Sequence, residues 1–258
     1  MATVSPAANW KPTWSRMVSV PSGLLTCCVT SLASSTVVVM LFPFSPSLRR
    51  SWLSLLSVGL LLVIPLAHAA VPPAAATAPK ILVLGDSLSA GYGIDVRRGW
   101  VALLQQQLRQ AGYGHVVVNA SVSGETSAGA LARLPRALQL HRPVVVIIEL
   151  GGNDGLRALP PADLQRNLAA IARASRAAGA KPLLLGMQLP PNYGPEYTRR
   201  FAAAYPTVAK AERTALVPFF LEGIATQPAL FQADGIHPVE AAQPRLLQNL
   251  WPTLEKLL

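Results

Sequence analysis

Four short, separated segments of the chain hold residues that can carry out acyl transfer. Three of them follow predicted strands, and the fourth precedes the last predicted helix. The segments are residues 85–88 (GDSL), 123–124 (SG), 151–154 (GGND) and 234–238 (DGIHP). Together they supply a hydroxyl nucleophile, a base with its orienting carboxylate, and donors for an oxyanion. Their order and their shared position at strand ends predict a serine hydrolase.

Ser87 is the predicted nucleophile. It lies at a strand-to-helix turn, where its hydroxyl can project into a crevice and its backbone N–H can face a developing oxyanion. A serine hydroxyl needs a base, and His237 stands in a Gly- and Pro-bounded turn with Asp234 three residues earlier. At that spacing the carboxylate can reach Nδ1, which leaves Nε2 to accept the serine proton. The alternative is a local turn bond between Asp234 and His237 with no further partner.

Two further residues are predicted to stabilise the oxyanion. Gly124 has no side chain to obstruct a substrate, so its backbone N–H can serve as a second donor. Asn153 offers its side-chain amide and follows two glycines that allow close approach of the backbone. The alternative for both residues is ordinary turn chemistry, because Ser-Gly and Asn-Asp are common in loops.

The acidic residues beside these segments are expected to be structural. Asp86 and Asp154 neighbour functional positions and are predicted to brace their turns. Glu149, at the end of an apolar strand, is predicted to be a paired structural carboxylate. A glycosidase built from two such carboxylates would leave Ser87 and His237 without roles.

The elements that must position these residues alternate between strands and helices. Apolar runs without polar alternation, separated by helices, predict an α/β fold with a parallel sheet covered on both sides. The predicted strands are residues 80–85, 115–119, 144–150, 183–187 and 216–220. The predicted helices are residues 99–112, 127–139 with a kink or restart at Pro135, one ending at Gly179, 196–213, and one beginning at Val239.

A sheet of this kind binds ligands in the crevice beyond the carboxyl ends of its strands. Ser87 follows the first predicted strand by two residues, Gly124 follows the second by five, and Asn153 follows the third by three. Three neighbouring strands are therefore predicted to deliver their loops to a single crevice.

These residues resemble the SGNH (GDSL-type) hydrolase superfamily, in which Ser, Gly, Asn and His stand in four separated blocks. Ser87, Gly124, Asn153 and His237 match that pattern, with Asp234 as the third member of the triad. The chain is most similar to the branch of bacterial periplasmic arylesterases, acyl-CoA thioesterases and lysophospholipases. That similarity spans roughly residues 80–256 and is carried by residues 85–93 (GDSLSAGYG), 149–157 (ELGGNDGLR), 189–194 (LPPNYG) and 234–238.

The resemblance implies a three-layer α/β/α sandwich of flavodoxin type, with neither metal nor cofactor. It also implies hydrolysis of aryl esters, acyl thioesters and lysophospholipids through an acyl-serine intermediate in a shallow, adaptable crevice. The Gly-x-Ser-x-Gly elbow of α/β-hydrolases is absent, in agreement with a different fold. From position alone, the side chains expected to line or cover the acyl chain are Leu156, Leu159, Leu189, Pro190 and Tyr193.

Two alternative functions remain at this stage. One is a carbohydrate acetyl esterase of the same superfamily, although the tyrosines are dispersed and form no sugar platform. The other is a non-catalytic flavodoxin-like binding module whose first loop cradles a phosphate through backbone groups. The second alternative leaves the pair Asp234 and His237 unexplained.

The first 69 residues are predicted to be an N-terminal extension that ends in a signal peptide. Arg49 and Arg50 precede an apolar run at 52–66, and cleavage is expected before Ala70, which would place the enzyme in the periplasm. The run is 15 residues, about 22 Å as a helix, and falls short of the ~30 Å hydrocarbon core. Residues 24–42 are also uncharged and long enough for an N-terminal membrane anchor.

Two points about this extension stay open in the sequence. Translation starting at Met40 would make residues 1–39 a start-site error, and the paired arginines also suit a twin-arginine signal. Residues 70–79 are expected to form a Pro/Ala tether, and residues 80–258 a single domain.

Composition excludes several kinds of site and several classes of binding partner. Both cysteines lie in the extension, so an exported chain would have no catalytic thiol, disulfide or cysteine-ligated metal. Beyond residue 69 the chain has 18 Lys and Arg against 12 Asp and Glu. This balance suits an arginine-rich surface or weak, transient attraction to anionic lipid. No basic run is interleaved with aromatic residues, which argues against nucleic acid, and we expect a monomer.

Overall fold

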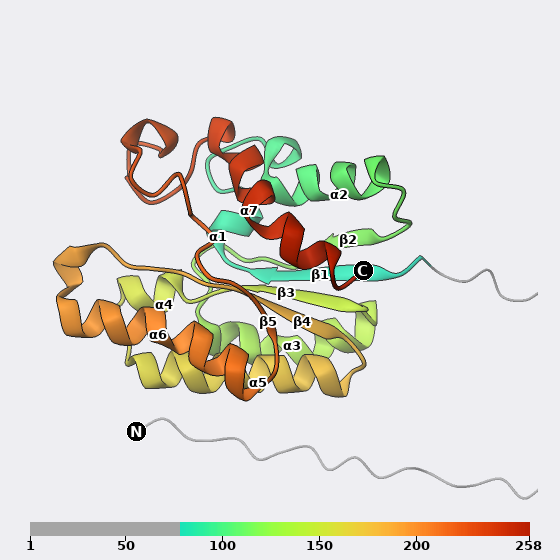
Figure 1. Cartoon of the computed structure of the whole chain (residues 1–258), viewed down its shortest axis with the longest axis horizontal. Helices are drawn as coiled ribbons and strands as arrows, with labels where there is room; N and C mark the ends of the chain where they lie inside the picture. Colours follow the sequence, from blue (N-terminus) through green and yellow to red (C-terminus); the bar gives the residue numbers. More distant parts are fainter. Residues whose placement is uncertain (1–77) are drawn as a thin grey trace, which may run out of the picture. The chain divides into compact units, whose positions relative to one another are not determined.

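The computed structural model describes residues 78–258, so the predicted signal peptide, the alternative start and most of the tether lie outside the described residues. Within them, five parallel strands form one sheet in the order β2-β1-β3-β4-β5 (Figure 1). The strands are β1 (Lys80–Gly85), β2 (Val116–Asn119), β3 (Val145–Glu149), β4 (Lys181–Leu185) and β5 (Ala215–Val217).

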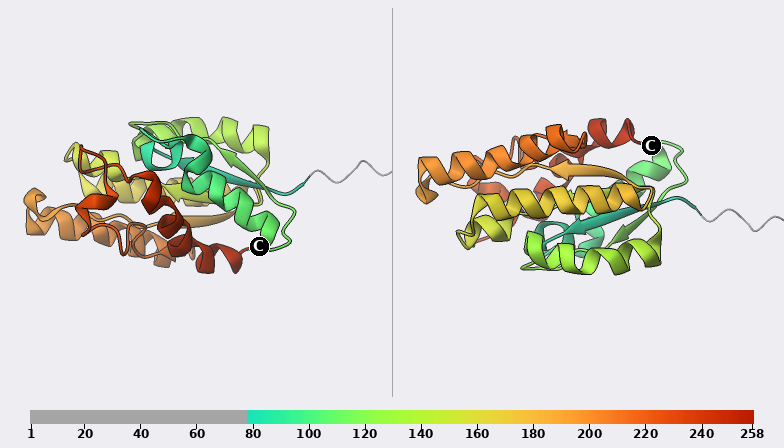
Figure 2. Two further views of the ribbon diagram at one scale, coloured as in Figure 1. Left: turned by 90° about the horizontal axis from the view of Figure 1, so that it is seen from above. Right: turned by 90° about the horizontal axis from the view of Figure 1, so that it is seen from below.

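Helices cover both faces of this sheet, which confirms the predicted three-layer α/β/α sandwich. Helices α2 (Trp100–Gln110) and α7 (Gln243–Glu255) pack together on one face. Helices α3 (Ser127–His141), α5 (Pro161–Ala177) and α6 (Pro195–Ala211) lie side by side on the other (Figure 2). The short elements are α1 (Ser87–Ala90), α4 (Gly152–Leu156) and the 3₁₀ turns η1 (Val96–Arg98), η2 (Pro191–Tyr193), η3 (Pro228–Leu230) and η4 (Glu240–Ala242).

The core lies on both sides of the central strands because β1 and β3 are apolar on both faces. Every residue of β3 is buried, as are the last five of β1. Each long helix adds an apolar stripe at helical spacing, such as Leu246, Leu250 and Leu254 of α7. A fully buried leucine of this kind contributes roughly 1.5–3 kcal/mol. The edge strand β2 is only partly buried, unlike the central strands.

Many element boundaries differ from the sequence expectation by a residue or more, and four differences have a clear physical reason. Helix α3 continues unbroken through Pro135, because the stripe of Ala130, Leu134 and Leu138 packs on the core across it and outweighs one missing backbone bond. Strand β5 stops at Val217, since the next residue is a proline that has no N–H for the ladder. Strand β4 begins at Lys181, two residues early, because the Lys181 N–H already bonds the carbonyl of Val144, the residue before β3.

The fourth difference is at the last helix. A 3₁₀ turn, η4, precedes α7, which therefore begins at Gln243 instead of Val239. No helix within residues 78–258 has both the length and the apolar character to cross a membrane.

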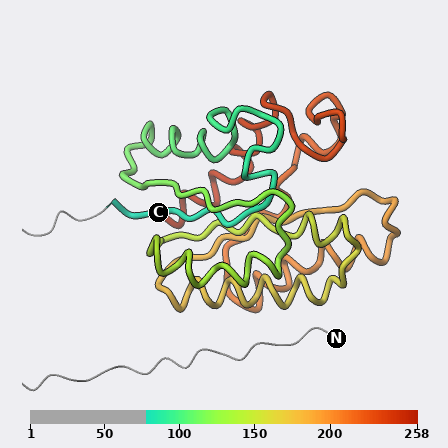
Figure 3. Tube along the Cα trace, turned by 180° about the vertical axis from the view of Figure 1, so that it is seen from behind, coloured from blue at the N-terminus to red at the C-terminus, as the bar shows by residue number. Residues whose placement is uncertain are grey.

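The loops that carry the predicted site residues lie at one end of the sheet. Figure 3 shows the loops after β1, β3, β4 and β5 at the end opposite to the C-terminus. Because all five strands are parallel, these loops leave from the carboxyl ends of the strands.

Candidate active site

Ser87 begins helix α1 one residue after the turn that ends β1. Asp86 caps this helix, because its Oδ1 accepts a hydrogen bond of 3.0 Å from the N–H of Leu88. Gly85 makes the turn possible: a Cβ there would lie 2.6 Å from the Oγ of Ser89 and 2.9 Å from Oε2 of Glu149. Buried side chains of Asp86, of Ser89 on α1 and of Glu149 on β3 thus surround the turn that carries the serine.

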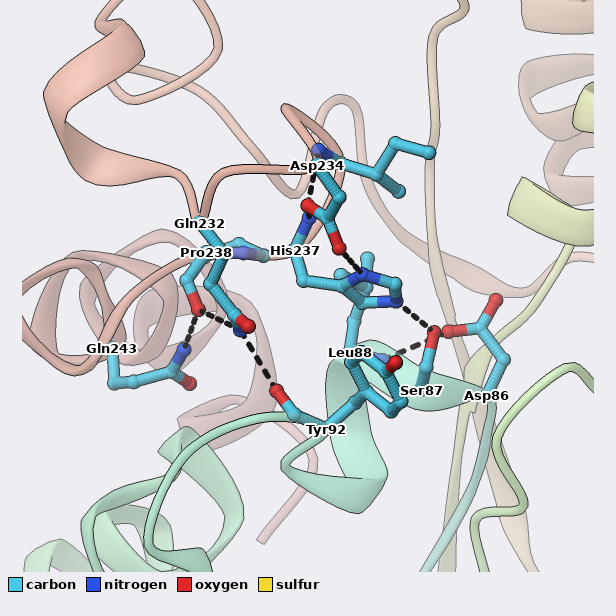
Figure 4. Close-up of polar contacts among 10 residues, drawn as sticks. Asp86, Ser87, Leu88, Tyr92, Gln232, Asp234, His237, Pro238 and Gln243 are labelled. Atoms are coloured by element: carbon cyan, nitrogen blue, oxygen red, sulfur yellow. Dashed lines mark hydrogen bonds and ion pairs between the residues drawn. The ribbon is translucent and has the colours of Figure 1, made fainter.

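A continuous line of hydrogen bonds joins Ser87 to His237 and Asp234 (Figure 4). Nε2 of His237 lies 2.8 Å from Oγ of Ser87, and Nδ1 lies 2.6 Å from Oδ2 of Asp234. The contact between Ser87 and His237 spans 150 positions of sequence. It excludes the alternative in which Asp234 and His237 bond only to each other.

The turn from residue 234 to 238 also fixes the charge of Asp234. Its Oδ1 accepts the backbone N–H groups of Ile236, at 2.9 Å, and His237, at 3.0 Å. These bonds and the imidazole lower the pKa of Asp234 to about 2, the backbone bond from His237 contributing most. Gly235 adopts φ +66°, a left-handed conformation that glycine accepts without strain. An ionised carboxylate therefore holds the Nδ1–H tautomer and leaves the Nε2 lone pair for the serine proton.

Tyr92 is a neighbour of the imidazole that sequence reasoning missed. Its ring centroid lies 4.4 Å from that of His237, with the planes tilted by 38°. Gln232 ties the two loops together: its side chain donates to the carbonyl of Tyr92 and its backbone N–H to the carbonyl of His237, each at 2.8 Å. The segment GDSLSAGYG gives no local signal for this contact, which depends on the fold.

Of the three expected oxyanion donors, two line the cavity beside the nucleophile and one does not. Ser87 and Asn153, which is on α4, line the same cavity. Gly124 does not line it, although its loop lies beside the nucleophile turn, where the N–H of Val122 bonds the carbonyl of Gly85 at 3.0 Å. Gly124 has φ +80°, and its carbonyl accepts from the guanidinium of Arg157. Its role as a donor stays a prediction.

The buried acids near the site differ in their partners. Asp154 braces the start of α3, because its carboxylate accepts from the N–H of Ser127 at 2.8 Å and from its hydroxyl at 2.5 Å. Glu149 accepts from the hydroxyl of Ser89 at 2.6 Å but forms no ion pair in the part of the chain that the structure describes. Its partners at the end of β3 are the hydroxyl of Ser89 and the backbone N–H of Asp86, so Glu149 is bonded within the fold, as expected of a structural carboxylate. Among residues 78–258 no cluster of three or more His, Cys, Asp or Glu is arranged to hold a metal ion.

A cavity of about 450 Å³ opens beside Ser87 and His237, and its wall is mostly apolar. Leu156, Leu189 and Pro190 line it, as expected, whereas Leu159 and Tyr193 do not. Tyr193 instead directs its hydroxyl to the carbonyl of Leu156, 3.4 Å away, from outside the wall. Sequence reasoning missed the part of the wall contributed by the segment after β5, whose members are Phe219, Leu221, Ala225, Thr226 and Phe231.

Leu159 lies outside because its backbone serves another contact. Its carbonyl accepts a hydrogen bond of 2.7 Å from the hydroxyl of Tyr197 on α6, and its side chain is partly exposed. The apolar character of residues 219–221 and their position directly after a strand end were the available signals for the missed wall.

Comparison with known proteins finds a family of lipases and acylhydrolases, and relatives that are named esterase or thioesterase. Residues 83–243 match the GDSL-like Lipase/Acylhydrolase family. The esterase TesA of Pseudomonas aeruginosa is 61% identical over 183 residues, which cover 71% of this chain and 91% of that protein. Thioesterase 1/protease 1/lysophospholipase L1 of Escherichia coli K12 is 45% identical over 184 residues, or 71% of this chain and 87% of that protein.

Solved structures show the same likeness. The crystal structure of TesA matches with a TM-score of 0.68 at 61% identity, covering 69% of this chain and 99% of that one. The psychrotrophic esterase EstA from Pseudoalteromonas sp. matches with a TM-score of 0.66 at 42% identity, covering 69% of this chain and 97% of that one.

Proposed function

Because the chain belongs to the GDSL-like lipase/acylhydrolase family, we propose that it cleaves its substrates through an acyl intermediate on Ser87. It is a carboxylic ester hydrolase that acts on acyl esters and thioesters. The observation that carries the proposed mechanism is the line from Asp234 through His237 to Ser87, with contacts of 2.6 and 2.8 Å.

The reaction follows from this geometry in two halves. His237 takes the proton of Ser87 through Nε2 as Oγ attacks the acyl carbonyl carbon. The oxyanion that forms accepts hydrogen bonds from the N–H of Ser87 and the amide of Asn153, with Gly124 as the predicted third donor. His237 then protonates the leaving alcohol or thiol, which departs and leaves the acyl group on Ser87.

The second half regenerates the enzyme. His237 takes a proton from water, the resulting hydroxide attacks the acyl carbonyl, and the carboxylic acid leaves as Ser87 recovers its proton. Asp234 stays ionised throughout, because the hydrogen bonds of its turn hold its pKa at about 2.

Replacement of Ser87 tests the proposal directly. Ser87→Ala should lower kcat for an aryl ester and an acyl thioester alike by about 10⁴-fold or more. Ser123→Ala is the matched control, because this serine is exposed and lies outside the cavity lining. Retention of more than a tenth of the activity in Ser87→Ala would contradict the mechanism.

The cavity supports a preference for substrates with an apolar acyl chain. Its lining has more apolar than polar groups, with Met187, Leu189 and Phe231 among them, and this favours hydrocarbon over sugar. The relatives named arylesterase and lysophospholipase L1 support aryl esters and lysophospholipids as further substrates. A panel that varies chain length and leaving group on the purified enzyme tests this point. A preference for acetylated polysaccharide would favour the carbohydrate esterase instead.

We propose further that the enzyme is exported to the periplasm, with cleavage before Ala70 and residues 80–258 as its one domain. The basic pair at Arg49 and Arg50, the apolar run after it and the small residues before Ala70 support this. N-terminal sequencing of the protein recovered from a periplasmic fraction tests it. A chain that begins well before Ala70 would support the membrane-anchored alternative.

A monomer in transient contact with lipid surfaces is the form we propose. Leu156 and Ile236 line the cavity and are also exposed, so apolar surface beside the cavity is available to a lipid. Light scattering tests the oligomeric state. Sedimentation with anionic and with neutral vesicles tests the contact, and equal absence of binding to both would contradict it.

A further inference from the structure

Two buried carboxyl groups lie beneath the nucleophile, and the mechanism above gives them no role. Asp86 is 2% exposed and Glu149 is 0% exposed, and neither forms an ion pair within the described residues. The backbone N–H of Asp86 donates to Oε2 of Glu149 at 3.3 Å, so Glu149 lies directly beside the residue that carries the other carboxyl group. Burial of two acids without a cation is costly unless one of them keeps its proton.

Of the two carboxyl groups, Glu149 has the stronger tendency to keep its proton. Burial and then the adjacent Asp86 carboxylate raise the pKa of Glu149 well above its usual value. Burial also raises the pKa of Asp86, but bonds from Leu88, Glu149 and Asn153 and the nearby His237 favour its charged form. The N–H of Leu88 and the amide of Asn153 each donate to one oxygen of Asp86, and this arrangement suits a carboxylate with two accepting oxygens.

The two oxygens of Asp86 serve two different purposes. Oδ1 caps helix α1 by accepting the N–H of Leu88, a bond that Figure 4 shows beside Ser87. Oδ2 accepts a hydrogen bond of 3.2 Å from the side-chain Nδ2 of Asn153. The first contact shapes the nucleophile turn, and the second reaches the residue proposed to stabilise the oxyanion.

The hydrogen bond from Asn153 to Oδ2 of Asp86 fixes the orientation of the Asn153 amide. A side-chain amide has an NH₂ group with two donors and a carbonyl that only accepts. An ionised carboxylate only accepts, so it holds the NH₂ end and repels the carbonyl. One N–H of Asn153 is then used by Asp86, and the other remains for a group in the cavity that Ser87 and Asn153 both line.

We propose that Asp86 is a positioning residue of the hydrolase, whose carboxylate orients the amide of Asn153 so that a donor faces the oxyanion. This inference rests on the proposed function and deepens it. An amide turned the other way would present its carbonyl oxygen to a developing negative charge, which would oppose the reaction. Asp86 thus acts on the reaction through Asn153.

Asp86→Asn tests the proposal with almost no change of shape. The new side chain keeps an oxygen for the N–H of Leu88 but places an NH₂ group against the NH₂ of Asn153, so the Asn153 amide is driven to turn over. We expect kcat to fall about 10²-fold, near the loss of an oxyanion donor, with little change of KM. Asp95→Asn is the matched control, because Asp95 also accepts from the N–H two residues ahead but its other oxygen binds Arg97.

Asp86→Ser distinguishes an effect on the orientation of the Asn153 amide from an effect on folding. Serine retains the capping oxygen but neither holds nor repels the amide of Asn153, which is then free to adopt both orientations. The activity should therefore be highest in the native enzyme, lower in Asp86→Ser and lowest in Asp86→Asn. If the role of Asp86 were only structural, Asp86→Asn would be more active than Asp86→Ser, because asparagine matches aspartate in shape and serine does not. This second variant also keeps the test informative if Asp86→Asn fails to fold.

A double-mutant cycle with Asn153→Ala completes the test. If Asp86 acts through Asn153, then Asp86→Ser should lower kcat in the native background and leave it unchanged in Asn153→Ala. Losses that multiply in the double variant would overturn the inference while leaving the proposed function intact. An unchanged kcat in Asn153→Ala alone would instead overturn the role of Asn153 in the proposed function, and the inference with it.

Discussion

The site has two acidic regions, and their surroundings shift the pKa of the carboxyl groups in opposite directions. Asp234 lies in an exposed turn, with 37% of its side chain accessible, and its pKa is lowered to about 2 by hydrogen bonds from His237 and Ile236. Asp86 and Glu149 lie beneath the nucleophile, almost inaccessible, and burial raises the pKa of both. We propose that the exposed turn supplies a permanent charge for proton transfer, whereas the buried pair fixes geometry with a minimum of charge.

His237→Ala removes the centre of the exposed region and should have the largest effect. We expect kcat to fall about 10⁴–10⁶-fold, because the serine hydroxyl then has no base. The melting temperature should change little, since the turn is anchored by backbone bonds such as that from the N–H of Gly235 to the carbonyl of Gln232. Steady-state kinetics and thermal melts measure the two quantities. A loss of less than tenfold would show that another group activates Ser87.

Asn153→Ala removes the group that the buried region is proposed to orient. Turnover should fall by about 10²–10³-fold, with a smaller effect on substrate binding, because the amide is proposed to stabilise charge that exists only in the transition state. Separate measurement of kcat and KM checks this. A change confined to KM would assign Asn153 to substrate binding.

The cavity wall between the two regions offers a smaller and more selective test. Leu189→Ser should lower kcat/KM for long acyl chains roughly tenfold relative to short ones, because it lines the cavity. Leu159→Ser should leave that ratio unchanged, since Leu159 lies outside the lining. Hydrolysis rates for a series of chain lengths provide the comparison. Equal effects of the two variants would mean that the acyl chain binds elsewhere.

The smallest expected effect is on the pH dependence of stability. The folded protein holds the proton of Glu149 to a higher pH than the unfolded chain, whose pKa is near 4.5. The contribution of this residue to the free energy of unfolding is therefore fully present below that pH and is lost as pH rises toward the folded-state pKa. The glutamine in Glu149→Gln has no proton to lose. The free energy of unfolding of this variant, relative to that of the native enzyme, should therefore increase as pH rises. Denaturant unfolding from about pH 4 to about pH 9 measures the difference, and parallel curves would mean that Glu149 is ionised.

The fold and the triad were accessible from the sequence because their signals are local. Asp234 and His237 stand three residues apart in one turn, and Ser87 and Asn153 each follow a strand end in a parallel sheet. Convergence of such strand ends is a property of the fold class, so it needs no knowledge of side-chain packing.

The parts that sequence reasoning missed depend on contacts between distant segments. Tyr92 meets His237 across 145 positions of sequence, and no pattern within either loop encodes that contact. The wall after β5 has no helical or strand periodicity from which a facing direction can be read. Leu159 was assigned to the wall from position alone, and its hydrogen bond to Tyr197 on α6 holds it outside.

The most direct test of the account is the site of covalent labelling by a fluorophosphonate, located by peptide mass spectrometry. The reagent carries an electrophile that a serine attacks only when a base activates it. We predict one adduct, on Ser87, formed rapidly in the native enzyme and at a strongly reduced rate in His237→Ala. Labelling at another residue, or an equal rate of labelling without His237, would contradict the proposed line from Asp234 through His237 to Ser87.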